Sequence, residues 1–480
     1  MAKNYSKSAA KAAKTHPVLA GIVIVLIVIV LVGAAVLWYF RPGVYHIYLG
    51  IGEHSWGEWN VQTAATCSKT GLKYRICSTC EKREEEIIPA TGDHKWDDDE
   101  MCTDCGYDKN FFAVETDVAE AEFSIHVIDL GKYAGDSIYI KAGGNDILID
   151  AGSRSESAGL ICNYLSNYVT DGKLEYVIAT HADQDHIAAF AGSGNPRNGV
   201  LYNFEVDTLI HFDFVKKDKE ANALKPNTVY GGFVEAVTYL QSKGTNVYTA
   251  SECYDELNGA SRQYWLDGEH TLSMNILYNY YYYNQSSDEN NHSVVTLFTK
   301  DTDAGRRNFL FTGDLEKEGE EELVKYYAKA ENSKSEYDVL PQVDFYKAGH
   351  HGSGTSSTDN LLGVIQPDYV AVSCCAGAPE YTLNNLNTFP YQRSLENILK
   401  YTDRIYCTGQ AVNLPELDSD GKFASKTWDY KSMCGDIVFL LNMRQTAQGT
   451  VGNIKLWCSN SFTPLVETDW FKEYRNFDNL

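Results

Sequence analysis

A ten-residue stretch at residues 179–188, with the sequence ATHADQDHIA, constrains this chain more than any other feature. It holds four side chains that commonly bind metal ions: His181, Asp183, Asp185 and His186. The stretch follows an apolar run at residues 174–179 that the pattern predicts to be a buried strand. Ligands at a strand end lie at the sheet edge where α/β proteins keep their chemistry. Imidazole with carboxylate suits zinc, manganese or iron, whereas a calcium site would be mostly oxygen.

Three further groups of candidate ligands adjoin predicted strands downstream. Asn290-Asn-His292 precedes a strand, Phe311-Thr-Gly-Asp314 ends one, and Lys347-Ala-Gly-His350-His351 ends another. The same sheet edge could therefore present all of them. This recurrence favours a metal site over the alternative of a solvated Asp/His turn.

Apolar runs alternate with helical patterns from about residue 120 to 460, which predicts one layered α/β domain. The expected strands are 123–129, 137–141, 146–149, 176–179, 208–211, 293–298, 309–311, 343–348 and 369–373. The expected helices are 158–168, 232–242, 317–329 and 394–401. Residues 409–432 are expected to be a polar, acidic insertion, and residues 461–480 a C-terminal tail.

Length and charge limit the function classes. A chain of 480 residues is expected to form two or three units. The net charge of −24 does not support a long nucleic-acid footprint, because proteins that grip polyanions by charge are usually basic. A small site that binds phosphate through metal ions remains compatible with this charge.

Residues 18–40 contain no charged side chain, and a helix of this length spans a bilayer. Residues 1–16 carry four lysines and no acid. The positive-inside rule therefore predicts a cytoplasmic tail at 1–16, a transmembrane helix at 17–40 and an extracellular remainder on the cell membrane.

Residues 41–110 form a different, cysteine-rich segment. Two Cys-x-x-Cys pairs, Cys77 with Cys80 and Cys102 with Cys105, stand near zinc-ribbon spacing. His54-Ser-Trp56 and His94-Lys-Trp96 precede them as a short internal repeat. A module this small needs a metal or disulfide staple. We expect a structural zinc held by these four cysteines, and disulfides are the alternative outside the cell. The segment resembles short Cys/His/Trp repeats of Gram-positive surface proteins, which implies spacing or adhesion in such a bacterium.

Six motifs in order resemble those of the metallo-β-lactamase superfamily, and more closely the hydrolase domain of ComEC/Rec2-type competence proteins. They are His126-Val-Ile-Asp-Leu-Gly131, Gly135-Asp136-Ser, Leu148-Ile-Asp150-Ala-Gly152, the cluster at 181–186, Gly313-Asp314-Leu-Glu and Gly349-His-His-Gly-Ser353. The resemblance covers roughly residues 122–440. It implies an αββα sandwich, two sheets with helices outside, over a domain at 120–460.

The resemblance also implies two divalent metal ions. The first ion would be bound by His181, Asp183 and His292. The second would be bound by Asp185, His186 and one of the adjacent histidines, with His351 favoured over His350. Asp314 would bridge both ions, while Asp150 and Asp136 would orient ligands by hydrogen bonds. Zinc is the expected metal. Most relatives have histidine where Asp183 stands, and the extra carboxylate makes the first site harder, so manganese is the alternative.

The implied reaction is hydrolysis by a hydroxide that bridges the two ions, with Asp185 and His350 as catalytic residues. A bridging carboxylate at Asp314 favours a phosphodiesterase or nuclease over a β-lactamase, since superfamily members that open β-lactams lack one. The substrate would be a nucleic acid or a cell-wall polymer, and nothing in the sequence points to a protein partner.

Two alternatives stay open. One is a cell-wall phosphorylcholine or teichoic-acid esterase, in which Tyr280–Tyr283 could cage a quaternary ammonium group by cation–π contacts. Such a run of tyrosines is more often ordinary packing. The other is a non-catalytic surface binding protein.

Overall fold

The computed structural model describes residues 54–475 and 477. The gaps within this range are 68–69, 98–99, 101, 105–108, 110, 195–196, 304, 329–339 and 447–448. The predicted cytoplasmic tail at 1–16 and transmembrane helix at 17–40 lie outside the described residues, as does Cys105. Within the described ranges, none of the helices has the length and apolar character of a membrane span.

The chain divides into two units, one formed by residues 1–64 with 72–86 and the other by residues 65–71 with 87–480. A small sheet has the order β1-β2-β3. Its strands are β1 (Asn60–Thr63), β2 (Gly71–Ile76) and β3 (Arg83–Ile88). β1 and β2 run antiparallel, and every residue of β1 is exposed. This sheet therefore buries little apolar surface of its own.

The second unit contains two eight-stranded sheets. The first sheet has the order β19-β18-β4-β5-β6-β7-β8-β9, and β6 to β9 run parallel. Its strands are β4 (Phe123–Val127), β5 (Ile138–Ala142), β6 (Asn145–Ile149), β7 (Lys173–Ala179), β8 (Glu205–His211), β9 (Asn246–Thr249), β18 (Ile437–Thr446) and β19 (Gly449–Cys458).

The second sheet has the order β10 to β17 in sequence, and β13 to β16 run parallel. Its strands are β10 (Gln263–Trp265), β11 (Leu272–Ile276), β12 (Thr296–Thr302), β13 (Gly305–Phe311), β14 (Phe345–Lys347), β15 (Tyr369–Ala376), β16 (Ile405–Val412) and β17 (Asp429–Ser432). Both sheets thus contain a parallel half whose carboxyl ends can meet.

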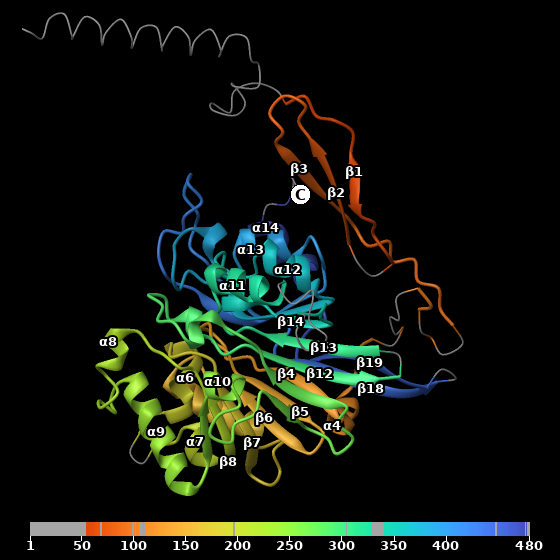
Figure 1. The fold of residues 1–480 in the computed structure, drawn as a ribbon. Helices are drawn as coiled ribbons and strands as arrows, with labels where there is room; N and C mark the ends of the chain where they lie inside the picture. The colour runs from red at the N-terminus through yellow and green to blue at the C-terminus, as the bar shows by residue number, and fades with distance from the viewer. Residues whose placement is uncertain are drawn as a thin grey trace, which may run out of the picture. The chain divides into compact units, whose positions relative to one another are not determined.

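The two sheets pack face to face around an aromatic core. The rings of Phe123 and Phe309 lie 4.7 Å apart, and those of Phe345 and Phe439 lie 4.8 Å apart, so strands of both sheets interdigitate. Figure 1 shows helices on the outer face of each sheet, which makes the predicted αββα sandwich. The helices are α4 (Glu115–Glu120), α5 (Ala158–Leu165), α6 (Gln184–Ala191), α7 (Val200–Asn203), α8 (Lys217–Glu220), α9 (Val229–Lys243), α10 (Ala250–Tyr254), α11 (Lys317–Ala328), α12 (Asp359–Ile365), α13 (Gln392–Ile398) and α14 (Asp469–Tyr474).

Within the segment expected to be a C-terminal tail, Leu465, Trp470 and Phe471 are buried beside the second sheet. The polar insertion expected at 409–432 is bounded by strands, since β16 runs into it and β17 ends it. β17 is the edge strand of the sheet, and its polar residues hide the period-two pattern that would reveal it.

A buried histidine lies on β4, within the first of the six motifs. His126 is fully buried and shares hydrogen bonds with Ser124 Oγ and Tyr164 OH, each 2.8 Å long. Burial, together with the charge of Lys141, lowers the pKa of His126 from 6.5 to about 3. This side chain is therefore held neutral in the folded protein.

We expect His126 to make the fold acid-sensitive. The pKa of His126 is lower in the folded chain than in the unfolded chain. Its contribution to the free energy of unfolding is therefore complete above pH 6.5 and is lost as the pH falls toward 3. Between these two pKa values, the free energy of unfolding falls by about 1.4 kcal/mol for each pH unit. Thermal melting at pH ~7 and ~5 should show a smaller loss of stability in His126→Gln than in the wild type. The exposed His270→Gln is the control, and an unchanged pH dependence in His126→Gln would contradict the assignment.

Candidate metal centre

The ligand cluster lies where the parallel halves of the two sheets meet. His181 follows β7 and His186 lies in the first turn of α6, both from the first sheet's side. Asp314 follows β13, and His350 and His351 follow β14, both in the second sheet. The carboxyl ends of parallel strands from both sheets therefore bring the predicted clusters to one place.

Main-chain hydrogen bonds fix the loop that carries Asp185 and His186. The N–H of Asp136 donates to the carbonyl of Asp185 (3.0 Å), and the N–H of Ala151 donates to that of His186 (2.7 Å). A Cβ atom at Gly152 would lie 1.6 Å from the Asp185 carbonyl oxygen, so only glycine allows this approach. This contact explains two glycine-containing motifs of the sequence.

Three buried histidines are anchored through Nδ1. His186 Nδ1 donates to Asp150 Oδ2 (2.7 Å), and His351 Nδ1 donates to the carbonyl of Ser373 (3.0 Å). His181 Nδ1 lies 3.1 Å from Thr180 Oγ1, whose own hydroxyl donates to Asp150 Oδ2. Each ring is thereby fixed in the tautomer that leaves Nε2 available, which is the usual arrangement of metal-binding histidines.

The opposite nitrogens of these rings converge on Asp314. Nε2 of His181, His186 and His351 is buried without a hydrogen bond, and so is Asp314 Oδ1. Asp314 Oδ2 lies 3.0 Å from His186 Nε2 and 3.4 Å from His351 Nε2. Two overlapping groups could hold an ion, one of His181, His186 and Asp314, the other of Asp185, His186 and His351. Buried polar atoms without partners are rare, so this donor set fits divalent metal ions.

The charges at the site also favour binding of divalent metal ions. Although burial lowers the pKa of His186, the carboxylates of Asp314 and Asp150 hold it well above its ordinary value. Burial likewise opposes the charge of Asp314, but the neighbouring histidines keep its pKa well below the usual range. The carboxylates thus create a negative potential that bound cations would neutralise.

Asp136 orients His351 from behind. Asp136 is buried, and its oxygens lie 2.5 Å from Lys347 Nζ and 3.3 Å from His351 Nδ1. Ser373 Oγ also donates to Asp136. Asp136 and Asp150 thus contact different histidines of the candidate site, and their role as positioning residues stays a prediction.

Asp183 and His292, two of the three ligands expected for the first ion, contact residues outside the expected ligand set. Lys219 Nζ contacts Asp183 Oδ1, and Asp183 Oδ2 lies 3.6 Å from His181 Nε2. His292 Nε2 accepts the N–H of Ser286 (3.0 Å), while its Nδ1 lies 3.5 Å from the buried carboxylate of Glu289. The ligand set expected for the second ion is thus closer together than the set expected for the first.

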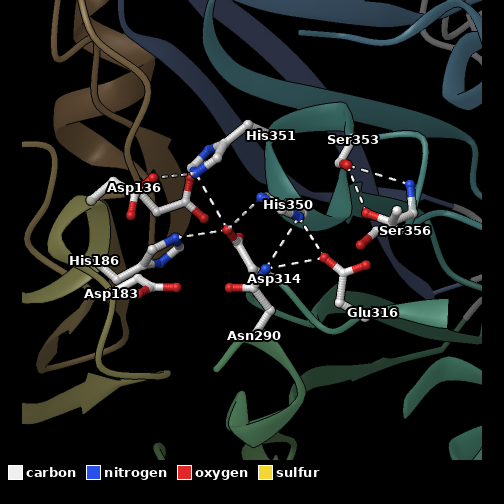
Figure 2. A network of polar contacts seen from close by, with 12 residues as sticks. Asp136, Asp183, His186, Asn290, Asp314, Glu316, His350, His351, Ser353 and Ser356 are labelled. Carbon is white, nitrogen blue, oxygen red and sulfur yellow. Dashed lines mark hydrogen bonds and ion pairs between the residues drawn. The ribbon is translucent and has the colours of Figure 1, made fainter. Parts of the chain in front are cut away.

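The two adjacent histidines have separate surroundings (Figure 2). His350 Nδ1 donates to Glu316 Oε1 (2.7 Å), and its Nε2 lies 3.8 Å from Asp314 Oδ2. Asn290 Nδ2 donates to the same Glu316 oxygen (3.0 Å). The side chain of His350 is 23% exposed and that of His351 is fully buried. This contrast suits His351 to metal binding and His350 to contact with a substrate.

One side of the site is open to solvent. The side chains of Asp183 and Asp185 are 36% and 19% exposed, and Tyr381 OH donates to Asp185 Oδ2 (3.2 Å). Substrate can therefore approach past these residues and His350. Lys219, Glu289, Glu316 and Tyr381 were not predicted, and only Glu316, two residues after Asp314, has a signal in a motif.

Within the tyrosine run at residues 280–283, two side chains make specific contacts with the rest of the fold. Tyr282 is buried and its hydroxyl accepts the N–H of Val295 (2.9 Å). Tyr283 OH donates to Asp255 (3.0 Å). These contacts favour the packing interpretation over an ammonium cage.

Residues 130–248 match the Metallo-beta-lactamase superfamily. The chain is 26% identical over 309 residues to ComE operon protein 3 of Bacillus subtilis, covering 60% of this chain and 32% of the relative. It is 25% identical over 256 residues to Competence protein ComA of Neisseria gonorrhoeae, covering 53% and 28%. Residues 130–248 are thus similar to metallo-β-lactamase domains, and the chain spans about a third or less of the length of the competence proteins that it matches.

A solved structure of a putative metallo-β-lactamase from Thermotoga maritima is 18% identical, with a TM-score of 0.22. It covers 40% of this chain and 79% of its own. A score this low does not by itself establish the fold, which follows instead from the sheet topology and the family match.

Asp150→Asn should weaken metal binding. An asparagine can still accept the N–H of Thr180, but its Nδ2 cannot accept the proton of His186 Nδ1. Loss of such a positioning partner costs about 10- to 100-fold in metal affinity. Competition with a chromogenic chelator measures this affinity, and the exposed Asp171→Asn is the matched control. Equal affinities in both variants would contradict the anchoring role of Asp150.

Proposed function

We propose that the protein is a membrane-tethered, extracellular, metal-dependent phosphodiesterase. The observation that carries this proposal is the convergence of three anchored histidines on the buried carboxylate of Asp314. Two bound ions would supply Lewis-acid charge stabilisation and lower the pKa of water toward neutrality. Zinc suits the imidazole-rich ligands, and manganese is the alternative.

The chain's own residues would perform the remaining tasks. Asp185, accessible from the open side, would position the attacking water. As the new oxygen–phosphorus bond forms, the bond to the leaving oxygen breaks, and a proton must reach that oxygen. Although burial opposes it, the carboxylates of Asp314 and Glu316 raise the pKa of His350, so Nε2 can carry a proton while Nδ1 donates to Glu316. His350 would donate this Nε2 proton to a phosphoryl oxygen or to the leaving oxygen.

The central carboxylate supports phosphoester over β-lactam chemistry. Asp314 belongs to one candidate group, with His181 and His186, and its Oδ2 lies 3.4 Å from His351 Nε2 of the other group, so it would help to hold both ions. A compact pair suits in-line displacement at phosphorus, since each ion can stabilise one of the two reacting oxygens. The tether at 17–40 would place this activity on the outer face of the cell membrane.

The adjacent histidines give a matched test. We expect His351→Gln to lose both metal and activity on bis-p-nitrophenyl phosphate. His350→Gln should keep its metal while kcat falls about 100-fold, the scale of a lost proton donor. Metal content by mass spectrometry and steady-state kinetics measure these effects, and Asp314→Ala should resemble His351→Gln. If His350→Gln lost the metal and His351→Gln kept it, the roles would be reversed.

One observation favours a phosphorylcholine esterase as the second candidate. Tyr381 is 54% exposed, its hydroxyl donates to Asp185, and its ring lies 5.5 Å from that of Phe389. An accessible aromatic face beside a metal-binding carboxylate could contact a quaternary ammonium group.

Relative rates separate the two candidates. For a nuclease or general phosphodiesterase, single-stranded DNA and bis-p-nitrophenyl phosphate should be cleaved faster than p-nitrophenyl phosphorylcholine. Tyr381→Ala should then affect all substrates alike. If the choline ester reacts fastest, and Tyr381→Ala slows that substrate selectively relative to Tyr381→Phe, the esterase is correct. No hydrolysis of any substrate by the metal-loaded protein would favour a non-catalytic surface protein.

A further inference from the structure

The cysteines and histidines of residues 54–104 gather in two clusters that the hydrolase site does not involve. His54, Cys77 and Cys80 form one cluster, within the first unit. Cys67, His94 and Cys102 form the other, within the second unit. In both clusters, side-chain donor atoms lie within 4.8 Å of one another. This grouping differs from a single ribbon site, because it separates the two Cys-x-x-Cys pairs and adds Cys67 and both histidines.

The two clusters share one backbone frame. In the first, Trp56 forms an isolated antiparallel bridge with Cys77, and Ser78 donates its N–H (2.9 Å) and its hydroxyl (3.1 Å) to the carbonyl of Ser55. The rings of His54 and Trp56 lie 4.7 Å apart. The frame thus joins a His-x-Trp segment to the first residues of a Cys-x-x-Cys segment.

The second cluster repeats every one of these contacts. Trp96 forms an antiparallel bridge with Cys102, and Thr103 donates its N–H (2.8 Å) and its hydroxyl (3.2 Å) to the carbonyl of Lys95. The rings of His94 and Trp96 lie 4.9 Å apart. Chance cysteine pairs would not reproduce a hydrogen-bond pattern, so the frame is a repeated structural unit.

Distances between donor atoms match the edges of a metal tetrahedron. Cys67 Sγ and Cys102 Sγ lie 3.7 Å apart, whereas a disulfide would require about 2.05 Å. Two thiolates on one zinc ion at about 2.3 Å stand ~3.8 Å apart in tetrahedral geometry. Cys80 Sγ and His54 Nδ1 lie 3.4 Å apart, against ~3.5 Å for a thiolate and an imidazole on one zinc.

We propose that the segment binds two zinc ions, one held by His54, Cys77 and Cys80, the other by Cys67, His94 and Cys102. Thiolate with imidazole ligands selects zinc over the hard cations, and structural zinc sites use this ligand set. In sequence, Cys105 follows Cys102 at the spacing that Cys80 keeps from Cys77, but it lies outside the described residues. The proposal does not depend on the hydrolase activity.

The zinc ions would stabilise the fold of this segment by cross-linking it. Strand β1 is exposed along its whole length and β3 has no fully buried residue, so the small sheet lacks a substantial core. Small modules of this kind depend on metal ligation for their folding energy. Zinc at the two frames would therefore set the shape of the segment that precedes the hydrolase domain.

Cobalt substitution of the full chain, purified in detergent, tests the proposal. Thiolate-to-cobalt charge-transfer absorption reports only cysteine-bound ions, and the ligands gathered at the hydrolase site are histidines and carboxylates. We expect Cys67→Ser and Cys77→Ser each to lower this absorption without abolishing it, and the double variant to abolish it. Cys162→Ser, in helix α5 of the hydrolase domain, is the matched control and should leave the absorption unchanged. Circular dichroism verifies that each variant is folded.

Two other outcomes would overturn the proposal. If Cys77→Ser removed all the absorption and Cys67→Ser none, one ion would be shared by the Cys-x-x-Cys pairs. If the unreduced protein gave no such absorption and peptide mass spectrometry found disulfides among these cysteines, the staples would be covalent. Because neither readout involves hydrolysis, failure here is distinguishable from failure of the proposed enzyme activity.

Discussion

The carboxylate of Asp150 is the interaction on which the candidate metal centre depends. One of its oxygens accepts from His186 Nδ1 and from Thr180 Oγ1, and the other accepts the N–H of Thr180. Since Thr180 in turn contacts His181 Nδ1, a single buried carboxylate fixes the tautomers of two histidines. A histidine free to exchange tautomers would present a donor to the ion for part of the time. The charge of Asp150 therefore sets which nitrogens face the centre, although its oxygens face away from it.

The sandwich makes such a charge tolerable because it brings together elements that are distant in sequence. Asp150 follows β6 in the first sheet, while Asp314 and His351 follow β13 and β14 in the second. Burying these carboxylates without partners would be costly, but His186 contacts both Asp150 and Asp314, and the Thr180 hydroxyl donates to Asp150. The core phenylalanines between the sheets hold the two strand ends in register, so packing and electrostatics depend on each other.

Much of this arrangement was predictable from sequence. The motif carboxylates and histidines stand at strand ends, and strand ends follow from apolar alternation. Residues 145–149, for example, form β6 where 146–149 was expected. Strand β13 is longer than predicted, since Arg306 and Arg307 interrupt the apolar pattern while still pairing with β12. Lys219 and Tyr381 could not be predicted, because they reach the site from a short helix and a loop remote from the motifs. Cys67 likewise comes close to His94 and Cys102 only through the tertiary fold, and the sequence spacing of the cysteines does not predict this contact.

The adjacent histidines illustrate how backbone conformation resolves what sequence leaves open. His350 and His351 both adopt left-handed conformations, with φ of 45° and 52°. Each such residue costs roughly 1–2 kcal/mol, so the turn persists only because its contacts determine it. His351 is held by Ser373 and Asp136 on one side, and His350 by Glu316 on the other. Two successive left-handed residues thereby direct neighbouring rings to different partners, one ring into the buried ligand set and the other to its accessible side. The strain is located where, under the proposed function, consecutive positions would supply both a ligand and a substrate contact.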